Sequence, residues 1–158
     1  MSVVKAPHKA EWNLKYETTV FLAGSIEMGN AEDWQAMIPK LFKEYRNLTF
    51  FNPRRDDWDN SWEQKESNSQ FNEQVNWELK HLEKADIIFM YFSPETKSPI
   101  SLLELGLYAN SGKMVVCCPD NFYRKGNVDI VCGVYNIPLY NTLDAAVGKL
   151  RTLLKDTK

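Results

Sequence analysis

The sequence predicts a three-layer α/β domain with a mainly parallel sheet of five strands. Short apolar segments of strand length alternate with segments whose apolar residues recur at helical spacing. One of the apolar segments, ADIIFMYF at residues 85–92, is nearly continuous, as is typical of a central parallel strand buried on both faces. This alternation favours right-handed crossovers, which place helices on both sides of the sheet.

The first third of the chain predicts an arm, a strand and a helix. Residues 1–16 are polar with scattered aromatic side chains, and indicate an extended N-terminal arm. Residues 18–25, TTVFLAGS, are a short apolar run that ends in a Gly-Ser turn, and they predict the first buried strand. Residues 31–45 carry apolar side chains at helical spacing and predict an amphipathic helix, which Pro39 should kink or break.

The middle of the chain predicts a second strand, a long loop and a second helix. The strand is LTFFN at residues 48–52, and Pro53 ends it. Residues 54–67 form a polar loop whose length is usually functional or mobile in a compact domain. Residues 68–84 place apolar side chains on one face and predict a helix that leads into the central strand at 85–92.

The last third contains the most informative stretch, SPISLLELGLYANSGK at residues 98–113. It predicts a helix with Ser98 as its cap, Pro99 at its first position and Gly112 at its end. A fourth strand, an irregular stretch with a short helix after Asn127, a last strand and a closing helix follow at residues 114–118, 120–135, 137–140 and 142–154. We therefore expect residues 1–158 to form a single domain.

Composition and short motifs exclude several classes of function. A formal net charge of -2 provides no basic field for a nucleic-acid polymer, and the longest apolar runs are too short to span a membrane. The three cysteines are an odd number in apolar surroundings, as expected for reduced thiols of a cytoplasmic protein without a signal peptide. Neither GxGxxG nor GxxxxGK[ST] occurs, and no metal-ligand spacing is present, so we expect no cofactor and no metal.

Glu104 is the main catalytic candidate, because it is the one acid in the apolar helix at 98–113. Burying an unpaired charge is costly, so this carboxyl group must be satisfied, protonated or used. Its place near the start of the helix favours the ionised form. A charged carboxylate at the carboxyl edge of a parallel sheet suits a nucleophile or a base, whereas the alternative is a structural glutamate that caps a loop.

Glu78 is the second candidate acid. It lies close to the apolar stripe of the helix at 68–84, so its side chain could point toward the strand ends. The alternative is a simple ion pair with Lys80 or Lys84. Together with Glu104 it would make a two-carboxylate site, the arrangement that glycosidic-bond chemistry uses.

Substrate-binding candidates come from the loops that follow the strands, since ligands of such sheets bind beyond the carboxyl ends. Gly24 would allow close approach of a ligand or simply form a tight turn. Trp34, Trp58 and Trp62 suit stacking on a planar heterocycle, although a loop clamped by its own aromatic residues is the alternative. The candidates in these loops are Gly24, Ser25, Asn52, Arg54, Asp57, Trp58, Ser98 and Ser101.

Four stretches together resemble a known enzyme family. They are FLAGSI, FNPRRDDW, QVNWELKHLEKADIIFMYF and the helix SPISLLELGLYANSGK. In their order and spacing they are similar to the nucleoside 2-deoxyribosyltransferase superfamily, in its deoxyribosyltransferase-like branch, over roughly residues 20–135. The resemblance implies a flavodoxin-like sheet and cleavage of an N-glycosidic bond in a small-molecule nucleoside or nucleotide.

The resemblance also assigns roles to residues. It places the family's nucleophile on Glu104 and its upstream acid, normally an aspartate, on Glu78. The family's further acid before the catalytic helix has no match here, and Asp56 or Asp57 would supply its contact. Asn127 matches an asparagine that family members borrow from a neighbouring subunit, which implies a homodimer or a higher homo-oligomer with shared active sites.

Three functions follow as hypotheses. The first is transfer of 2-deoxyribose between nucleobases through a covalent deoxyribosyl-glutamate intermediate. The second is hydrolysis of nucleoside 5′-monophosphates, whose phosphate would bind Ser25, Ser98, Ser101, the start of the catalytic helix and Arg124 or Lys125. The third is a nucleotide-binding module without turnover.

Overall fold

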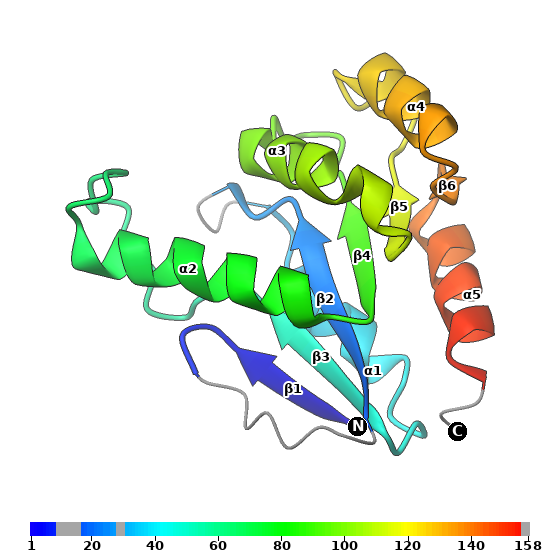
Figure 1. Cartoon of the computed structure of the whole chain (residues 1–158), viewed down its shortest axis with the longest axis horizontal. Helices are drawn as coiled ribbons and strands as arrows, with labels where there is room; N and C mark the ends of the chain where they lie inside the picture. The colour runs from blue at the N-terminus through cyan, green and yellow to red at the C-terminus, as the bar shows by residue number, and fades with distance from the viewer. Residues whose placement is uncertain (9–16, 28–30, 156–158) are drawn as a thin grey trace.

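A six-stranded parallel sheet forms the centre of the computed structural model, which describes residues 1–8, 17–27 and 31–155 (Figure 1). Its order is β1-β3-β2-β4-β5-β6. The strands are β1 (Ser2–Lys5), β2 (Thr18–Gly24), β3 (Leu48–Asn52), β4 (Ile87–Tyr91), β5 (Met114–Cys117) and β6 (Leu139–Tyr140). The helices are α1 (Trp34–Lys40), α2 (Ser69–Lys84), α3 (Pro99–Tyr108), α4 (Lys125–Val134) and α5 (Leu143–Leu153), and a 3₁₀ turn at Ala109–Ser111 continues α3.

The prediction of five strands is wrong by one strand, because the start of the predicted arm joins the sheet. β1 pairs in parallel with β3, with Ser2 opposite Thr49 and Lys5 opposite Asn52. The Ser2 and Thr49 hydroxyl groups are hydrogen-bonded at 2.6 Å. Four residues with two valines are too short a pattern to predict a strand. The rest of the arm, residues 9–16, lies outside the described residues.

The three layers that the sequence predicts are confirmed. Helices α2, α3 and α4 cover one face of the sheet, and α1 and α5 cover the other (Figure 1). Alternate residues of β2 serve the two cores, since Phe21 packs under the first group of helices and Leu22 under the second. Both side chains are fully buried, as the continuous apolar runs predict.

Two helices differ from their predicted bounds. α1 ends at Lys40, one residue after Pro39, which lies inside the helix. The chain then continues in turns, in which the N–H groups of Leu41 and Phe42 bond to the carbonyl oxygens of Ile38 and Pro39. α4 begins at Lys125, two residues before Asn127, because the segment after β5 already turns back at Phe122. Within the described residues, no helix is long and apolar enough to cross a membrane.

The three cysteines, Cys117, Cys118 and Cys132, are free and buried. Burial raises the pKa of the Cys117 and Cys118 thiols to about 12 and that of Cys132 to about 11. These thiols therefore remain protonated and serve as small apolar side chains of the core.

The chain reverses direction across the sheet between β2 and β4. From β2 it proceeds to β3 on one side and then returns to β4 on the other, which leaves the carboxyl ends of β2 and β4 adjacent, with Gly24 opposite Tyr91. Such a switch point is where open α/β sheets bind ligands. α2 leads into β4 and α3 follows it, so these two helices flank the switch point.

Candidate active site

Gly24 ends β2 at the switch point with a φ of +133°. A Cβ atom at this position would lie 2.1 Å from the Tyr91 carbonyl oxygen, which is far inside van der Waals contact. The structure therefore explains Gly24 by the close approach of β4, rather than by a ligand or a tight turn.

Glu104 lies in the middle of α3 and is 8% exposed. Tyr108, one helical turn later on the same face, has its hydroxyl group 3.5 Å from the Leu79 carbonyl oxygen of α2. This contact shows that the face bearing Glu104 is turned toward α2. The structure therefore brings the predicted nucleophile into the space between α2 and α3.

Glu78 approaches the same space from α2 and is half-buried. Its Oε1 atom accepts a hydrogen bond of 2.8 Å from Nε2 of Gln74, one turn earlier. The negative charge of Glu78 acts on Glu104 and disfavours a second negative charge there. The two predicted catalytic acids thus form a pair, one from each helix that flanks the switch point.

Burial changes the ionisation of both acids. It raises the pKa of Glu104 well above its ordinary value, and the charge of Glu78 raises that pKa further. Burial also raises the pKa of Glu78 to about 7, against the lowering effect of the Gln74 hydrogen bond. The prediction that the helix start keeps Glu104 ionised is therefore wrong for the isolated chain, because desolvation outweighs the helix dipole. Both acids therefore hold a proton more readily than an exposed glutamate does.

Three buried hydroxyl groups lie at the start of α3. Ser25, Thr96 and Ser98 are mutually hydrogen-bonded, with oxygen–oxygen distances of 2.6 to 2.8 Å. The prediction that Ser98 is the cap residue of α3 and Pro99 its first residue is confirmed. Ser98 has a left-handed backbone with a φ of 46°, however, and its side chain bonds no helical N–H. Ser101 is buried in the first turn of α3, on the same face as Glu104.

A glutamate from the loop after β2 occupies the backbone donors of this turn. Oε1 of Glu27 accepts hydrogen bonds from the N–H groups of Lys97 and Ser98, at 2.8 and 2.6 Å. The carboxylate takes the position in which a negatively charged ligand would meet the start of α3.

Asn52 and Arg54 hold the loop after β3 in place. Oδ1 of Asn52 accepts a hydrogen bond from the Arg54 backbone N–H at 2.9 Å. The Arg54 guanidinium donates to the carbonyl oxygens of Ala31 and Glu32, at 2.7 and 3.1 Å. Both residues lie at the carboxyl edge as predicted, where these contacts join two of the loops.

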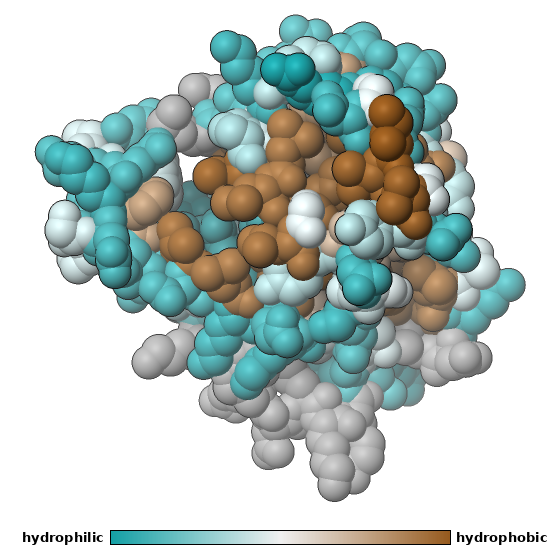
Figure 2. Space-filling view, turned by 45° about the horizontal axis from the view of Figure 1, so that its top comes forward, coloured by the Kyte–Doolittle hydropathy of each residue, from teal (hydrophilic) through white to brown (hydrophobic). Residues whose placement is uncertain are grey.

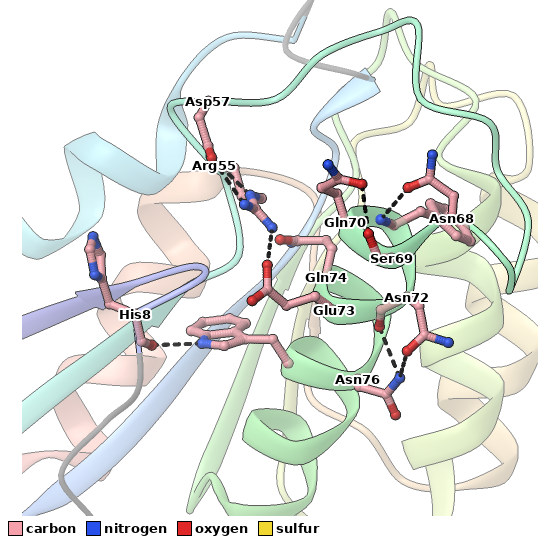
Figure 3. A network of polar contacts seen from close by, with 12 residues as sticks. His8, Arg55, Asp57, Asn68, Ser69, Gln70, Asn72, Glu73, Gln74 and Asn76 are labelled. Atoms are coloured by element: carbon pink, nitrogen blue, oxygen red, sulfur yellow. Dashed lines mark hydrogen bonds and ion pairs between the residues drawn. The ribbon is translucent and has the colours of Figure 1, made fainter.

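Asp57 is engaged by Arg55 on the outer side of α2 (Figure 3). The guanidinium donates to both carboxylate oxygens of Asp57, at 2.9 and 3.0 Å, and to Glu73 at 3.0 Å. The Arg55 hydrogen bond lowers the pKa of Asp57. A lowered pKa suits a permanent carboxylate rather than a proton donor.

The three tryptophans do not form one stacking surface. Trp34 is fully buried in the core and donates its indole N–H to the Ser25 carbonyl oxygen at 3.0 Å. Trp58 packs edge-on against Trp62 with ring centroids 5.1 Å apart, and Arg55 lies 5.1 Å above the Trp62 ring. This arrangement is the alternative in which the loop is clamped by its own aromatic residues.

Asn127 lies apart from the acid pair. It lines a groove of about 330 Å³ between α3 and α4, together with Leu102 and Gly106 of α3. Those two residues are each two positions from Glu104, so they lie on nearly the opposite side of the helix. Within one chain, α3 therefore lies between Asn127 and the Glu104 side chain.

The sequence reasoning missed three residues of this region: Glu27, Gln74 and Thr96. Gln74 had a signal, because it lies four residues before Glu78 and so shares its helical face. Glu27 and Thr96 lie in loops, where spacing along the chain carries no such signal.

Comparison with known proteins concerns the fold and the family of this chain. A crystal structure of a conserved protein from Enterococcus faecalis has the same fold, with a TM-score of 0.60 and 12% identity over 87% of this chain and 99% of that chain. A search among curated proteins gave no match. A family described as "Nucleoside 2-deoxyribosyltransferase like" matches residues 17–122, which include both acids. The chain therefore belongs to the nucleoside 2-deoxyribosyltransferase-like family.

Proposed function

We propose that this protein cleaves the N-glycosidic bond of 2-deoxyribonucleosides and transfers the deoxyribose to another nucleobase. The observation that carries this proposal is the buried pair of Glu78 and Glu104 at the switch point of the sheet. Members of this family are generally enzymes that act on nucleosides, and a two-carboxylate site suits glycosidic-bond chemistry.

The pair supports a double displacement. In the free protein, burial and the charge of Glu78 favour the proton on Glu104, so the reaction begins with transfer of this proton to Glu78. The Glu104 carboxylate then attacks the anomeric carbon, and the bond between this carbon and the base nitrogen breaks. The departing base takes the bonding electron pair and receives the proton from Glu78. A second base then attacks the deoxyribosyl ester, gives its N–H proton to the Glu78 carboxylate and releases Glu104, so the configuration of the sugar is retained.

The contacts of Glu27 favour an unphosphorylated substrate. At the start of α3, the N–H groups of Lys97 and Ser98 are already bonded to Glu27, and the hydroxyl groups of Ser25 and Ser98 are bonded to each other. A phosphate would have to displace this carboxylate against charge repulsion. The hydrolysis of nucleoside monophosphates is therefore the less favoured alternative.

A second copy of the chain would complete the site. Figure 2 shows apolar side chains gathered over α3 and α4. Five large apolar residues of these helices are between 57% and 70% exposed: Ile100, Leu103, Leu107, Ile130 and Val134. An apolar surface of this kind suits a partner helix, and Asn127 lies beside it. We propose a homodimer in which Asn127 serves the partner's acid pair.

Incubation with 2′-deoxynucleosides, with and without an acceptor base, tests the proposed function. Chromatography should show a new deoxynucleoside when the acceptor is present. Glu104→Gln should lower the rate by about 10⁴-fold or more, whereas the exposed control Glu44→Gln should leave it unchanged. Free base formed equally well without an acceptor would instead indicate a hydrolase. Binding without any release of base would indicate the non-catalytic module.

A further inference from the structure

Gln74 is the buried neighbour of the acid pair. It lies on α2 one turn before Glu78 and is 5% exposed. Its Nε2 atom donates to the Pro53 carbonyl oxygen at 2.7 Å and to Oε1 of Glu78 at 2.8 Å. Pro53 directly follows β3, so one amide group connects the end of a strand to a proposed catalytic acid.

These contacts decide which end of the amide is nitrogen. A peptide carbonyl oxygen can only accept a hydrogen bond, so the atom of Gln74 that faces Pro53 must be the donor. Both hydrogens of the NH₂ group are then used, one by Pro53 and one by Glu78. The orientation of the Gln74 side chain is therefore fixed, with the amide oxygen on the remaining side.

The amide oxygen of Gln74 has no hydrogen-bond partner among the described residues, although it is buried. Buried acceptors nearly always have a donor, and one without a partner is costly to the folded state. Gln35 also has a buried amide oxygen without a donor. Its nitrogen, however, contacts the Ser25 carbonyl oxygen only at 3.5 Å, so its orientation is less firmly set. The unpartnered amide oxygen of Gln74 is therefore the stronger observation.

We propose that Gln74 reads the nucleobase: its amide oxygen accepts an N–H of the base held beside Glu78. This inference rests on the proposed function, since it assigns a ligand to the same site. The ligand class is a base with an amino or ring N–H group on the edge that faces α2. A base with only ring-nitrogen acceptors on that edge would place lone pairs against the amide oxygen and would bind poorly.

Gln74 is at the same time a positioning residue for Glu78. Its amide holds the carboxyl group at a fixed distance from the end of β3, and its hydrogen bond favours the charged form of Glu78. One side chain thus connects recognition of the base to the acid proposed to protonate it. A residue that only stabilised α2 would affect neither the choice of base nor the ionisation of Glu78.

Substrate pairs that differ in one donor test the proposal. The first pair is 2′-deoxyadenosine and purine 2′-deoxyriboside, and the second is 2′-deoxycytidine and 2-pyrimidinone 2′-deoxyriboside. Each pair is assayed with the wild type and with Gln74→Met, an unbranched side chain of similar length without polar atoms. The bases of a pair differ in leaving ability, so the informative quantity is the change in the kcat/KM ratio between the two proteins.

We expect the ratio of at least one pair to fall about tenfold in Gln74→Met. We also expect the pH dependence of kcat to shift upward, because Glu78 loses a hydrogen bond to its charged form. Gln74→Asn, whose side chain is shorter by one methylene group, should show the same fall in the kcat/KM ratio. This variant replaces Gln74→Met in the assay if the methionine variant does not fold. The exposed Gln70→Met, one turn earlier on α2, is the control that should change neither quantity.

Unchanged ratios for both pairs in a folded variant overturn the proposal. Failure of the proposed function is a separate result: the wild type then releases no base from any deoxynucleoside. In that case the binding of free adenine and free purine is compared by calorimetry. A preference for adenine that Gln74→Met abolishes still supports the assignment, and equal affinities of the wild type for the two bases overturn it.

Discussion

The charge of Glu78 raises the pKa of Glu104 across the space between α2 and α3. Neither carboxyl group therefore ionises independently, and the two titrate as a pair. Because both pKa values are raised, the pair holds a proton at a higher pH than two isolated glutamates would. Bond cleavage with departure of a poor leaving group needs a protonated and an ionised carboxyl group at once.

The first prediction concerns stability against pH. A carboxyl group whose pKa is raised by folding binds more protons in the folded state, so its contribution to stability is lost as pH rises from the unfolded pKa through the folded one. For Glu78 this window extends from 4.5 to about 7. Over that window, Glu78→Gln should reduce the pH-dependent loss of unfolding free energy by roughly 3 kcal/mol.

Urea denaturation of the wild type and Glu78→Gln at pH 5 and pH 8 measures this loss. The variant should be the more stable protein at pH 8. Glu73→Gln, one of the exposed residues of the same helix, provides a comparison with an acid on the solvent side. Equal pH dependence in the wild type and Glu78→Gln would show that Glu78 is not desolvated in solution.

The second prediction concerns the 5′ end of the substrate. Removal of the Glu27 carboxylate by Glu27→Ala frees the N–H groups of Lys97 and Ser98 and removes a negative charge. Activity toward 2′-deoxynucleoside 5′-monophosphates should then rise about tenfold relative to the unphosphorylated nucleosides, because charged hydrogen bonds are stronger than neutral ones. The exposed neighbour Glu32→Ala is the control. A wild type that already prefers the monophosphates would contradict this role of Glu27.

The third prediction concerns the switch point. Gly24→Ala should destabilise the fold by about 2–5 kcal/mol, because the added methyl group meets the Tyr91 carbonyl and the backbone has a positive φ. Gly148→Ala, in the open middle of α5, is the matched control and should stabilise the protein by up to about 1 kcal/mol. Thermal unfolding compares the two. A Gly24→Ala protein as stable as the wild type would refute the close approach of β4.

The fourth prediction concerns the second copy. If Asn127 serves a partner's site, Glu104→Gln and Asn127→Ala proteins should each be inactive alone. Their mixture should regain activity, because a mixed dimer has one site with both residues intact. Leu103→Glu should prevent the recovery by placing a charge on the apolar surface of α3. Sedimentation velocity measures the size of each species, and a monomeric wild type would contradict the shared site.

Much of the fold was predictable from periodicity. The apolar runs and the helical stripes gave five of the six strands and the layers, since both patterns repeat over many residues. β1 was missed because a strand of four residues at the edge of a sheet needs only one apolar face, and Val3 and Val4 provide too little pattern. The hydrogen bond from the Ser98 backbone N–H to Glu27 was missed because the two residues are far apart in the sequence.

The sequence predicted which loops meet at the candidate site, but it did not predict the hydrogen bonds between their residues. The rule that ligands bind beyond the carboxyl ends of parallel strands predicted Ser25 and Ser98 in one region. In the structure their hydroxyl oxygens are hydrogen-bonded at 2.6 Å. The ionisation of Glu104 was predicted in the wrong direction, because the helix dipole is visible in the sequence whereas the burial of the side chain and the charge of Glu78 depend on the tertiary fold. The ion pair of Asp57 was similarly hidden, because nothing in the sequence shows that Arg55 bonds both Asp57 and Glu73.

The buried cysteines make the chain inert toward thiol-specific reagents, since all three are protonated at ordinary pH and shielded from solvent. A cysteine introduced at an exposed position, such as Asn110 after α3, would then be the single site that a maleimide modifies. A spin label or a fluorophore attached there reports distances between copies without prior removal of native cysteines.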